Sequence, residues 1–418
     1  MAHVGDRLYA ARWCAGKSGR QTSMDALADF FPHLLVFAAL LLAAIALTPA
    51  VESVGLPGPA AFLAVGVIAG YLEIVPTDRL GELPLEQIGV LGLYAILFQG
   101  GLATGYTAWR KEAGPILALG TVGTAATAGL VSLFAHYLLG FEWTLAALVA
   151  VALSPTDPAA VYATLRGRDQ FRRARVVLEG ESGFNDPVSI SLMIAVVAFV
   201  SSGHATVTGS AVHLVQELGL GLVGGVAGAG VLVLLLKATP RLEEALESIA
   251  VLITVVVIGA ATAVAHGSGF LGVYVAGLLF ADRWAAQDGT KHAIPESVSA
   301  AAEPVLFGLL GAVFAPRVTG GDVIDGAVLT LVTFCLLRPA IVLACLSRSS
   351  FTRTERLVVT LGGLKGAVPL LLAGYAALEA LPQTNRTEAV VLSATAISIL
   401  VQGWGLSVVT SSRASTVE

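Results

Sequence analysis

An aspartate between two prolines interrupts an otherwise apolar segment in the first half of the chain. Asp157 is flanked by Pro155 and Pro158 within residues 153–158. Proline removes a backbone donor and clashes with the preceding turn, so this run predicts a helix that breaks or unwinds at Asp157. At membrane depth, unwound backbone is tolerated where it is buried in protein or lines a cavity, and its freed carbonyl groups can coordinate a cation. A proline kink capped by Asp157 is the alternative interpretation.

A second interruption lies in the other half, where residues 361–369 read Leu-Gly-Gly-Leu-Lys-Gly-Ala-Val-Pro. Two interrupted hydrophobic segments, one in each half, indicate an inverted-repeat transporter whose binding site lies between two crossed, broken helices. Asp157 and Lys365 are then the charges set against the helix ends at that crossing. A glycine-rich packing face, from which Lys365 snorkels to the surface, is the alternative.

Acidic, hydroxyl and amide side chains gather in one short run after the first interruption, Glu-Gly-Glu-Ser-Gly-Phe-Asn-Asp-Pro. Ser182 and Asp186 are four residues apart and share one face of a helix, while Glu181 and Asn185 share the neighbouring face. Together with Asp157, the first pair offers the hard oxygen ligands that an alkali cation accepts. Glu181 is better placed to neutralise a buried lysine. An ordinary helix start, stabilised by its own acids, is the alternative.

The composition assigns these residues to a membrane protein. Of 418 residues, 56% are hydrophobic without glycine, a further 46 are glycine, and 13% are charged. Soluble proteins are about 45–50% apolar with glycine included and about 25% charged, so a two-domain soluble enzyme is excluded. The formal net charge of −5 offers no basic surface for nucleic acid. The three cysteines lack paired or metal-ligand spacing, which excludes a disulfide framework and a zinc site.

Apolar runs separated by charged, glycine or proline positions predict the membrane-spanning elements, each of which needs about 20 mostly apolar residues. We predict an all-α polytopic membrane protein with about thirteen transmembrane helices in inverted repeats. The runs are 31–49, 57–72, 86–105, 114–139, 142–164, 174–200, 208–236, 247–266, 268–282, 298–315, 322–346, 356–376 and 388–411. The transmembrane domain is predicted over 31–411 and a short cytoplasmic tail over 412–418. The polar segment 1–30 is left outside the fold, since Met24 is an alternative start.

Lysine and arginine set the predicted orientation, because cytoplasmic loops retain them. With the N-terminus outside, the inward-facing loops hold most of these residues, led by the five arginines between positions 166 and 175. The polar segment 1–30 is the discordant piece. We therefore expect a multi-pass protein of the cell membrane, plasma or inner, with its C-terminus in the cytoplasm.

Charges of both signs also fall inside the apolar runs. A charge at mid-bilayer costs about 2.5–3.5 kcal/mol on insertion scales, so each must be paired, solvated or part of an ion path. The group comprises Arg338, Lys365, Asp157, Glu179, Glu181, Asp186 and Glu303. For Arg338 the sequence leaves the counter-ion open between Glu303 and Glu179, and removing that counter-ion should destabilise the protein.

These motifs resemble those of the monovalent cation/proton antiporters of the sodium/proton exchanger type, over roughly residues 35–410. The shared motifs are Thr156-Asp157-Pro158, Glu181-Ser182-x-x-Asn185-Asp186, Gly363-Leu364-Lys365-Gly366, the glycine-rich run 267–277 and Glu303-Pro304-Val305-Leu306-Phe307. The resemblance implies a dimerisation bundle, a six-helix core that moves like an elevator, and a homodimer. It also implies a transporter with a role in pH homeostasis, without enzymatic activity or a cofactor.

The same resemblance implies electroneutral exchange of Na⁺, Li⁺ or K⁺ for a proton, because the paired motif reads Asn-Asp. It implies that Glu181 pairs with Lys365. The implied ion-binding residues are Asp186, Asp157, Ser182, Thr156 and Asn185. If only a proton or a cation on Asp186 allows the core to cross the membrane, exchange is obligatory.

Two positions depart from the pattern of many relatives. Lys365 stands where arginine is common, and lysine, unlike arginine, can lose its proton when buried and so join the proton chemistry. Gln99, within Phe-Gln-Gly-Gly, stands where many relatives carry an acid. Its side chain offers a carbonyl oxygen without a charge, which bears on cation affinity and on the choice between Na⁺ and K⁺.

Two other functions remain as alternatives. A cation channel or uniporter can be built from the same broken helices, although a buried Glu181–Lys365 pair suits alternating access better. An intramembrane serine protease would use Ser182 as nucleophile and His266 as a base within hydrogen-bond reach. Thirteen helices, the acids flanking the serine, and Phe184 in place of the second glycine of a nucleophile elbow disfavour the protease.

Overall fold

The computed structural model places most of the chain. It describes residues 31–32, 34–74, 82–157, 165, 168–202, 207–239, 242–284, 293–379 and 381–412. The predicted polar segment 1–30 and all but the first residue of the predicted tail 412–418 lie outside these ranges. So does the second part of the predicted run 142–164.

Secondary structure in the described part is helical, without strands. In chain order the α-helices are α2 (Pro59–Tyr71), α4 (Glu82–Thr104), α5 (Tyr106–Lys111), α6 (Ala113–Leu117), α7 (Thr124–Leu139), α8 (Trp143–Ala152), α10 (Arg172–Ser202), α11 (Val207–Ala238), α12 (Glu244–Val264), α13 (Gly269–Trp284), α14 (Ala293–Phe314), α15 (Gly320–Val332), α16 (Arg338–Cys345), α17 (Arg353–Leu361), α18 (Ala367–Leu378) and α19 (Thr384–Ser412). A helix over Leu34–Ser53 precedes them. Short 3-10 segments are η2 (Asp169–Phe171) and η4 (Ala315–Arg317), and π-helical segments are η1 (Ala118–Gly123) and η5 (Thr333–Leu337).

Within the described ranges, nine helices are long and apolar enough to cross a membrane. Three further apolar helices, α2, α8 and α18, are shorter. Each of the thirteen predicted runs contains a described helix. The all-helical membrane architecture is therefore confirmed, while the count of thirteen transmembrane helices stays a prediction.

The boundary between the predicted runs 247–266 and 268–282 is a tight turn. α12 ends at Val264, α13 begins at Gly269, and His266 between them has φ +61°. A Cβ on Gly267 would meet the backbone of Gly221 in α11. The close approach of α11 at Gly267, together with the left-handed residue beside it, separates two apolar helices that hydrophobicity alone would run together.

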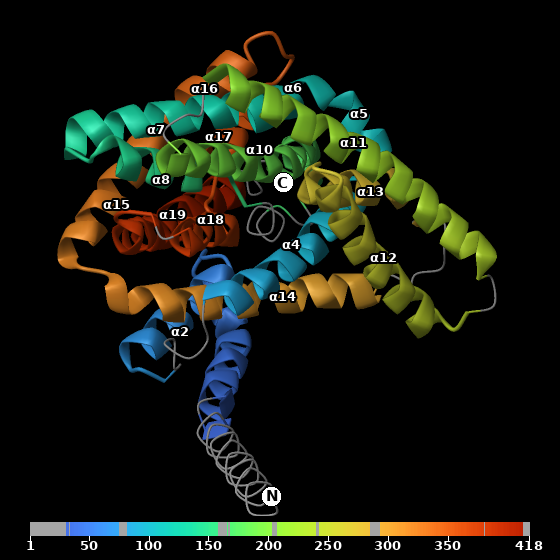
Figure 1. The fold of residues 1–418 in the computed structure, drawn as a ribbon, viewed down its shortest axis with the longest axis horizontal. Coiled ribbons are helices and arrows are strands. Elements are labelled where there is room, and N and C mark those ends of the chain that lie inside the picture. Colours follow the sequence, from blue (N-terminus) through green and yellow to red (C-terminus); the bar gives the residue numbers. More distant parts are fainter. Residues whose placement is uncertain are drawn as a thin grey trace, which may run out of the picture.

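Small residues bring the helices close together. Gly66 and Gly70 of α2 lie against the backbone of Gly308 and Ala312 in α14, so a Cβ at either glycine has no room. Glycines four residues apart give a helix the smooth face that allows such backbone approach in membranes. α4 packs on α13 and α14, and α15 and α18 both pack on α19. In Figure 1, α4 runs from α14 on the lower side of the molecule towards α13, and α18 and α19 lie together below α8 and α10.

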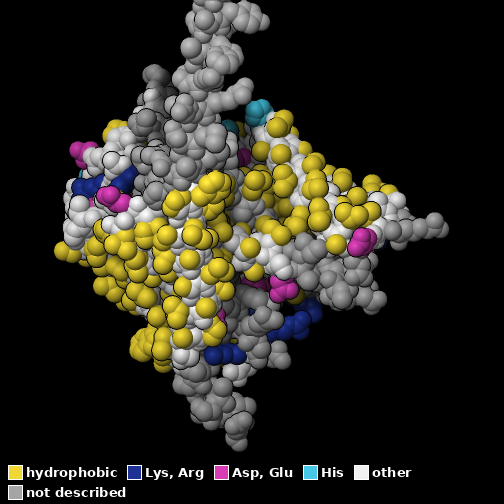
Figure 2. All heavy atoms as spheres, turned by 90° about the horizontal axis from the view of Figure 1, so that it is seen from below, with side chains coloured by type: hydrophobic (Ala, Val, Ile, Leu, Met, Phe, Trp, Pro, Cys, Tyr) yellow, Lys and Arg dark blue, Asp and Glu magenta, His cyan; other side chains and the backbone are white. Residues whose placement is uncertain are grey.

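Hydrophobic side chains cover most of the described surface seen in Figure 2, with few charged side chains among them. Exposed residues such as Leu42, Val215, Val223 and Val264 contribute to the apolar exterior. An apolar exterior of this size belongs in lipid, while the buried polar residues gather inside the molecule.

Candidate ion-binding site

The two interruptions predicted from the sequence meet inside the molecule. α8 ends at Ala152 and residues 153–157 are not helical; α17 ends at Leu361, and the non-helical residues 362–366 separate it from α18. The backbone N–H of Asp157 donates to the carbonyl of Leu364 at 2.8 Å. A Cβ on Gly366 would lie 2.5 Å from Cγ of Asp157. The absence of a side chain at Gly366 therefore allows the two segments to touch.

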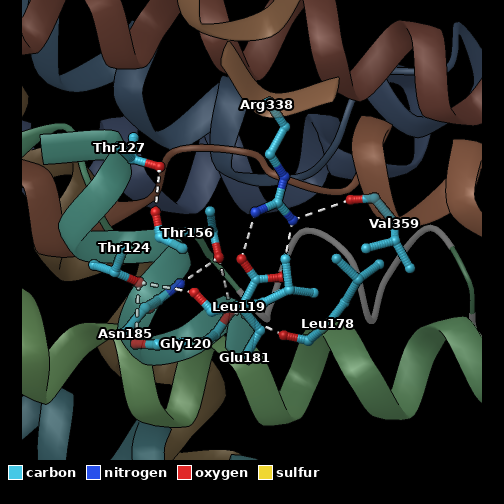
Figure 3. A network of polar contacts seen from close by, with 12 residues as sticks. Leu119, Gly120, Thr124, Thr127, Thr156, Leu178, Glu181, Asn185, Arg338 and Val359 are labelled. Carbon is cyan, nitrogen blue, oxygen red and sulfur yellow. Dashed lines mark hydrogen bonds and ion pairs between the residues drawn. The ribbon is translucent and has the colours of Figure 1, made fainter. Parts of the chain in front are cut away.

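A chain of hydrogen bonds joins the first interruption to α10. The Asn185 amide donates to the hydroxyl oxygen of Thr156 at 2.7 Å, and the Thr156 and Ser182 hydroxyls are 3.2 Å apart. Ser182 donates to the carbonyl of Leu178 at 3.1 Å, so Thr156 is the donor in their contact. Figure 3 shows Thr156 and Asn185 facing each other above α10. The structure thus brings together three of the predicted ion-binding residues.

The two remaining predicted ligands are carboxylates beside this chain. Asp186 is 1% exposed, and its Oδ1, like Oδ1 of Asn185, accepts no hydrogen bond from the described residues. Asp157 lies within electrostatic range of Asp186 and also of Glu303 on α14, whose Oε1 is likewise buried without a hydrogen bond there. Buried negative charge is costly unless a cation or a proton neutralises it. The cluster therefore suits a site that holds one or the other.

The predicted ion pair between Glu181 and Lys365 is wrong: Glu181 pairs with Arg338. Nη1 of Arg338 donates to Oε1 of Glu181, and Nη2 donates to Oε2 at 2.8 Å and to the carbonyl of Val359 at 3.0 Å. A planar guanidinium matches a carboxylate in this two-point geometry, which a lysine ammonium does not. Figure 3 shows both dashed contacts from Arg338 to Glu181. The two counter-ions considered for Arg338, Glu303 and Glu179, do not contact it in the described part.

Lys365 instead binds the carbonyl groups that the first interruption frees. Its Nζ donates to the carbonyl of Pro155 at 3.1 Å and to that of Ser154 at 3.5 Å. Its backbone N–H donates to the Ser398 hydroxyl at 3.0 Å. The ammonium thus stands at the negative, C-terminal end of α8, while the carboxylate of Asp157 lies beside Gly366, the N-cap of α18. Each charge faces the helix end of opposite sign.

Within the described ranges, no hydrogen bond or ion pair joins Gln99 or His266 to this cluster. Gln99 lies half-buried on α4. His266 is exposed in the turn after α12, and its described neighbours do not include Ser182, whose hydroxyl is engaged with Leu178 and Thr156. In the part of the chain that is described, no three His, Cys, Asp or Glu side chains form a metal-binding group. A Ser–His nucleophile pair and a zinc-type centre are thus without support.

Some residues around the cluster were missed by sequence reasoning. Ser398 and Val359 act from other helices through contacts with backbone atoms, and no sequence motif marks such contacts. Thr104 of α4 and Tyr274 of α13 lie near Glu179. Of these residues, Tyr274 lies inside a sequence motif, the glycine-rich run 267–277 that resembles the family.

Comparison with known families gives a match over most of the chain. The model of the transmembrane sodium/hydrogen exchanger family matches residues 38–411. The K(+)/H(+) antiporter NhaP2 of Shewanella sp. (strain MR-4) is 30% identical over 407 residues, which cover 94% of this chain and 68% of that protein. The Na(+)/H(+) antiporter ApNhaP of Aphanothece halophytica is 25% identical over 328 residues, covering 74% of this chain and 60% of that protein.

A solved structure has the same fold. The sodium proton antiporter MjNhaP1 from Methanocaldococcus jannaschii at pH 8 superposes with a TM-score of 0.73, covering 90% of this chain and 97% of that chain. The two sequences are 20% identical. At that identity the similarity establishes the arrangement of helices, and the roles of individual residues rest on their geometry here.

Proposed function

Because the chain belongs to the sodium/hydrogen exchanger family, we propose that it exchanges one monovalent cation, Na⁺ or K⁺, for one proton across a membrane. It is a multi-pass integral membrane protein of a cation/proton antiporter family, and its relatives are transporters. The identity of the cation, the stoichiometry and the mechanism are our proposal. Of the relatives compared, one at 30% identity is named a K(+)/H(+) antiporter and one at 25% a Na(+)/H(+) antiporter, so K⁺ is the first cation to test.

One observation carries the proposal: a buried carboxylate with an unfilled oxygen lies beside hydroxyl oxygens and a second carboxylate. Asp186 is 1% exposed, its Oδ1 accepts no hydrogen bond from the described residues, and Ser182 lies one helical turn away on the same face of α10. Asp157 repels the charge of Asp186 from the interruption opposite. A desolvated cation or a proton removes that repulsion, and only one of them fits at a time.

Competition for Asp186 makes the exchange obligatory. We propose that the cation binds to Asp186, Asp157, Ser182 and Thr156, with Asn185 holding the Thr156 hydroxyl. The Asn185–Asp186 pair carries one carboxylate, so a proton replaces a cation of equal charge and each cycle is electroneutral. The Glu181–Arg338 pair contributes no net charge and holds α10 to the start of α16.

Alternating access completes the proposal. The helices of the two interruptions and α10 would move together as a core against a dimerisation bundle that includes α2, in a homodimer of the cell membrane. The N-terminus would lie outside and the C-terminus in the cytoplasm. In this arrangement the exchanger contributes to pH homeostasis and needs no cofactor.

Proteoliposomes with an imposed pH gradient and an internal pH dye test the proposal. Na⁺, Li⁺ and K⁺ are added in turn, with and without the membrane voltage held fixed. We expect cation-dependent collapse of the gradient that does not depend on voltage and is absent in Asp186→Asn. Asp325→Asn is the matched control, since Asp325 lies on α15 and pairs with Arg386 away from the cluster.

Three outcomes count against the proposal. Retained exchange in Asp186→Asn removes this residue from the site. A current that depends on voltage and far exceeds carrier turnover supports a channel. No response to any of the three cations leaves the family membership intact and removes the proposed substrates.

A further inference from the structure

Glu179 is a buried carboxylate outside the ion-binding cluster. It is 5% exposed and lies on α10. Positions 179, 182 and 186 are spaced by three and four residues, so Glu179, Ser182 and Asp186 lie along one face of this helix. The rise of 1.5 Å per residue places Glu179 about 10 Å from Asp186 along the axis. One helix face therefore carries an acid at each end and a hydroxyl between them.

The negative charge of Glu179 is stabilised by fewer and longer contacts than that of Glu181. Oε2 of Glu179 accepts a long hydrogen bond, 3.4 Å, from the Thr104 hydroxyl, and Oε1 accepts none from the described residues. Nε of Arg175, one turn earlier on α10, is 3.7 Å from Oε1. Glu181, by contrast, has two hydrogen bonds from Arg338. Glu179 thus keeps an oxygen that can take a proton.

The groups that face Glu179 come from three helices. They are Arg175 of α10, Thr104 of α4 and Tyr274 of α13. The next arginine, Arg173, is held by Glu112 through two hydrogen bonds of 2.7 and 3.0 Å. Arg175 is therefore the cation that stabilises the charged form of Glu179.

α10 leads from water to this acid. Arg172 is exposed at its first position, the Arg175 side chain is 23% exposed, and residues 176–189 are all buried. Glu179 is the first carboxylate reached along this face from the exposed end. Beyond it, the ring of Tyr274 occupies the space where Gly183 lacks a side chain. The Tyr274 hydroxyl lies near Thr104 and Glu179, and its ring packs on Gly183, in the stretch of α10 between Glu179 and Asp186.

We propose that Glu179 is a second proton-binding group of the exchanger, which passes protons between Asp186 and the water at the Arg175 end of α10. When a cation takes Asp186, the O–H bond there breaks and an O–H bond forms on Glu179, through the Tyr274 hydroxyl or water. Glu179 then releases the proton to water, and the reverse sequence loads Asp186. No further reactant is needed. This inference rests on the proposed cation/proton exchange.

Two transport assays on the full-length protein in proteoliposomes separate this role from a structural one. Isotopic exchange of the cation for itself, at equal pH on both sides, needs the ion site and the conformational change but no proton transfer. Cation-driven proton flux needs the ion site, the conformational change and proton transfer. In Glu179→Gln we expect proton flux to fall about tenfold or more, since a positioned proton-transfer group contributes roughly 10²–10⁴-fold, with isotopic exchange within about twofold of the unmodified protein.

Further variants keep the inference falsifiable. Glu179→Asp should recover most of the proton flux with a shifted pH profile, and Tyr274→Phe, which keeps the ring over Gly183, should slow proton flux alone. Glu217→Gln on α11 is the matched control and should leave both rates unchanged, since Glu217 is a half-buried carboxylate 3.8 Å from His213.

The outcomes distinguish this inference from the proposed function. Equal proton flux and pH profiles in Glu179→Gln and the unmodified protein overturn the role of Glu179 alone. Equal loss in both assays assigns Glu179 a structural role and also overturns it. An unmodified protein inactive in both assays overturns the proposed exchange, and this inference with it.

Discussion

The two interrupted segments carry charges of opposite sign, and the charged groups around them differ in how fully they are hydrogen-bonded. The first carries Asp157 and faces Asp186 and Asn185, where oxygen atoms are buried without hydrogen-bond donors in the described part. The second carries Lys365 and lies beside Arg338, and there the terminal nitrogen atoms donate to carbonyl groups and to Glu181. Both regions place charge where lipid would reject it, but only the first has acceptors left over.

This difference assigns separate tasks to the two regions. Arg338 is already paired with Glu181, and Lys365 already donates to two carbonyl groups. Breaking such contacts is costly because it leaves a buried charge unpaired. A buried carboxylate with unfilled oxygens gains from any cation or proton that reaches it. On the proposed function, we therefore expect the second interruption to fix the geometry and the first, together with α10, to bind the ion.

The largest expected loss of stability comes from breaking the Glu181–Arg338 pair beside the second interruption. Arg338→Met leaves Glu181 charged and unpaired in the interior, which should cost about 3–5 kcal/mol of unfolding free energy. Thermal unfolding of the purified protein in detergent measures the loss. The double variant Arg338→Met/Glu181→Leu should recover much of it, since no unpaired charge remains. A double variant as unstable as the single one would contradict the pairing.

Lys365→Met is the comparison within the same region. It removes one ammonium hydrogen bond of ordinary length, 3.1 Å to the carbonyl of Pro155, and a long contact of 3.5 Å to that of Ser154. One bond to a charged group contributes about 1.5–3 kcal/mol. We therefore expect a smaller loss than in Arg338→Met. If Lys365→Met is the more damaging of the two, Lys365 and not Arg338 anchors the region.

Stabilisation of the folded protein by the bound cation tests the proposed site at Asp186. A cation that binds only the folded protein at 100 times its Kd stabilises it by about 2.7 kcal/mol. We expect the Tm to rise with the transported cation, at ionic strength held constant with choline chloride, and the rise to vanish in Asp186→Asn. An equal rise in Asp186→Asn would place the cation elsewhere, and an equal rise with choline would show an effect of salt alone.

The overall architecture was predictable because lipid imposes one rule on every span. Helices that cross lipid must be long and apolar, so the thirteen runs could be found from their length and from the charged, glycine and proline residues between them. Each run contains a described helix. The junction at Gly267 was the weakest prediction, since the two runs are separated only by a short turn. It is nevertheless where α12 gives way to α13.

The candidate site was predictable only as far as helical periodicity reaches. The spacing of Ser182, Asn185 and Asp186 fixes their faces on α10, and proline chemistry fixes the interruption before them. The partner of Glu181 could not be fixed in the same way. The π-helical segment η5 ends directly before Arg338, and an extra residue per turn rotates the subsequent side chains around the helix axis. No sequence motif marks that rotation, so the sequence does not identify Arg338 as the partner of Glu181.

Gly366→Ala tests the contact between the two interrupted segments, with a smaller expected loss of stability. A Cβ there would lie 2.5 Å from the Asp157 carboxylate, and overpacking of a buried site costs about 1–3 kcal/mol. Gly366→Ala should lower stability by that amount and weaken cation binding, measured by the cation-dependent Tm shift. The control is Gly374→Ala on α18, where the nearest side-chain atom is 3.6 Å away and the substitution has room. Equal cation shifts in both variants would mean that Asp157 does not need the contact with Gly366.

The smallest expected effect concerns an ion pair at the water-exposed end of α10, which contrasts with the buried pair of Arg338. Arg173, with 32% of its side chain exposed, binds Glu112 and lies 3.9 Å from the ring centre of Phe351, in the loop before α17. Water competes for both charges, so such pairs contribute about 0.2–1 kcal/mol, and salt screens them further. Arg173→Gln should therefore lower stability by less than about 1 kcal/mol, as read from thermal unfolding, and the loss should shrink further in 1 M salt. A loss as large as that of Arg338→Met, unchanged by salt, would mean that Arg173 is shielded from water and that the contrast between the buried and exposed pairs does not hold.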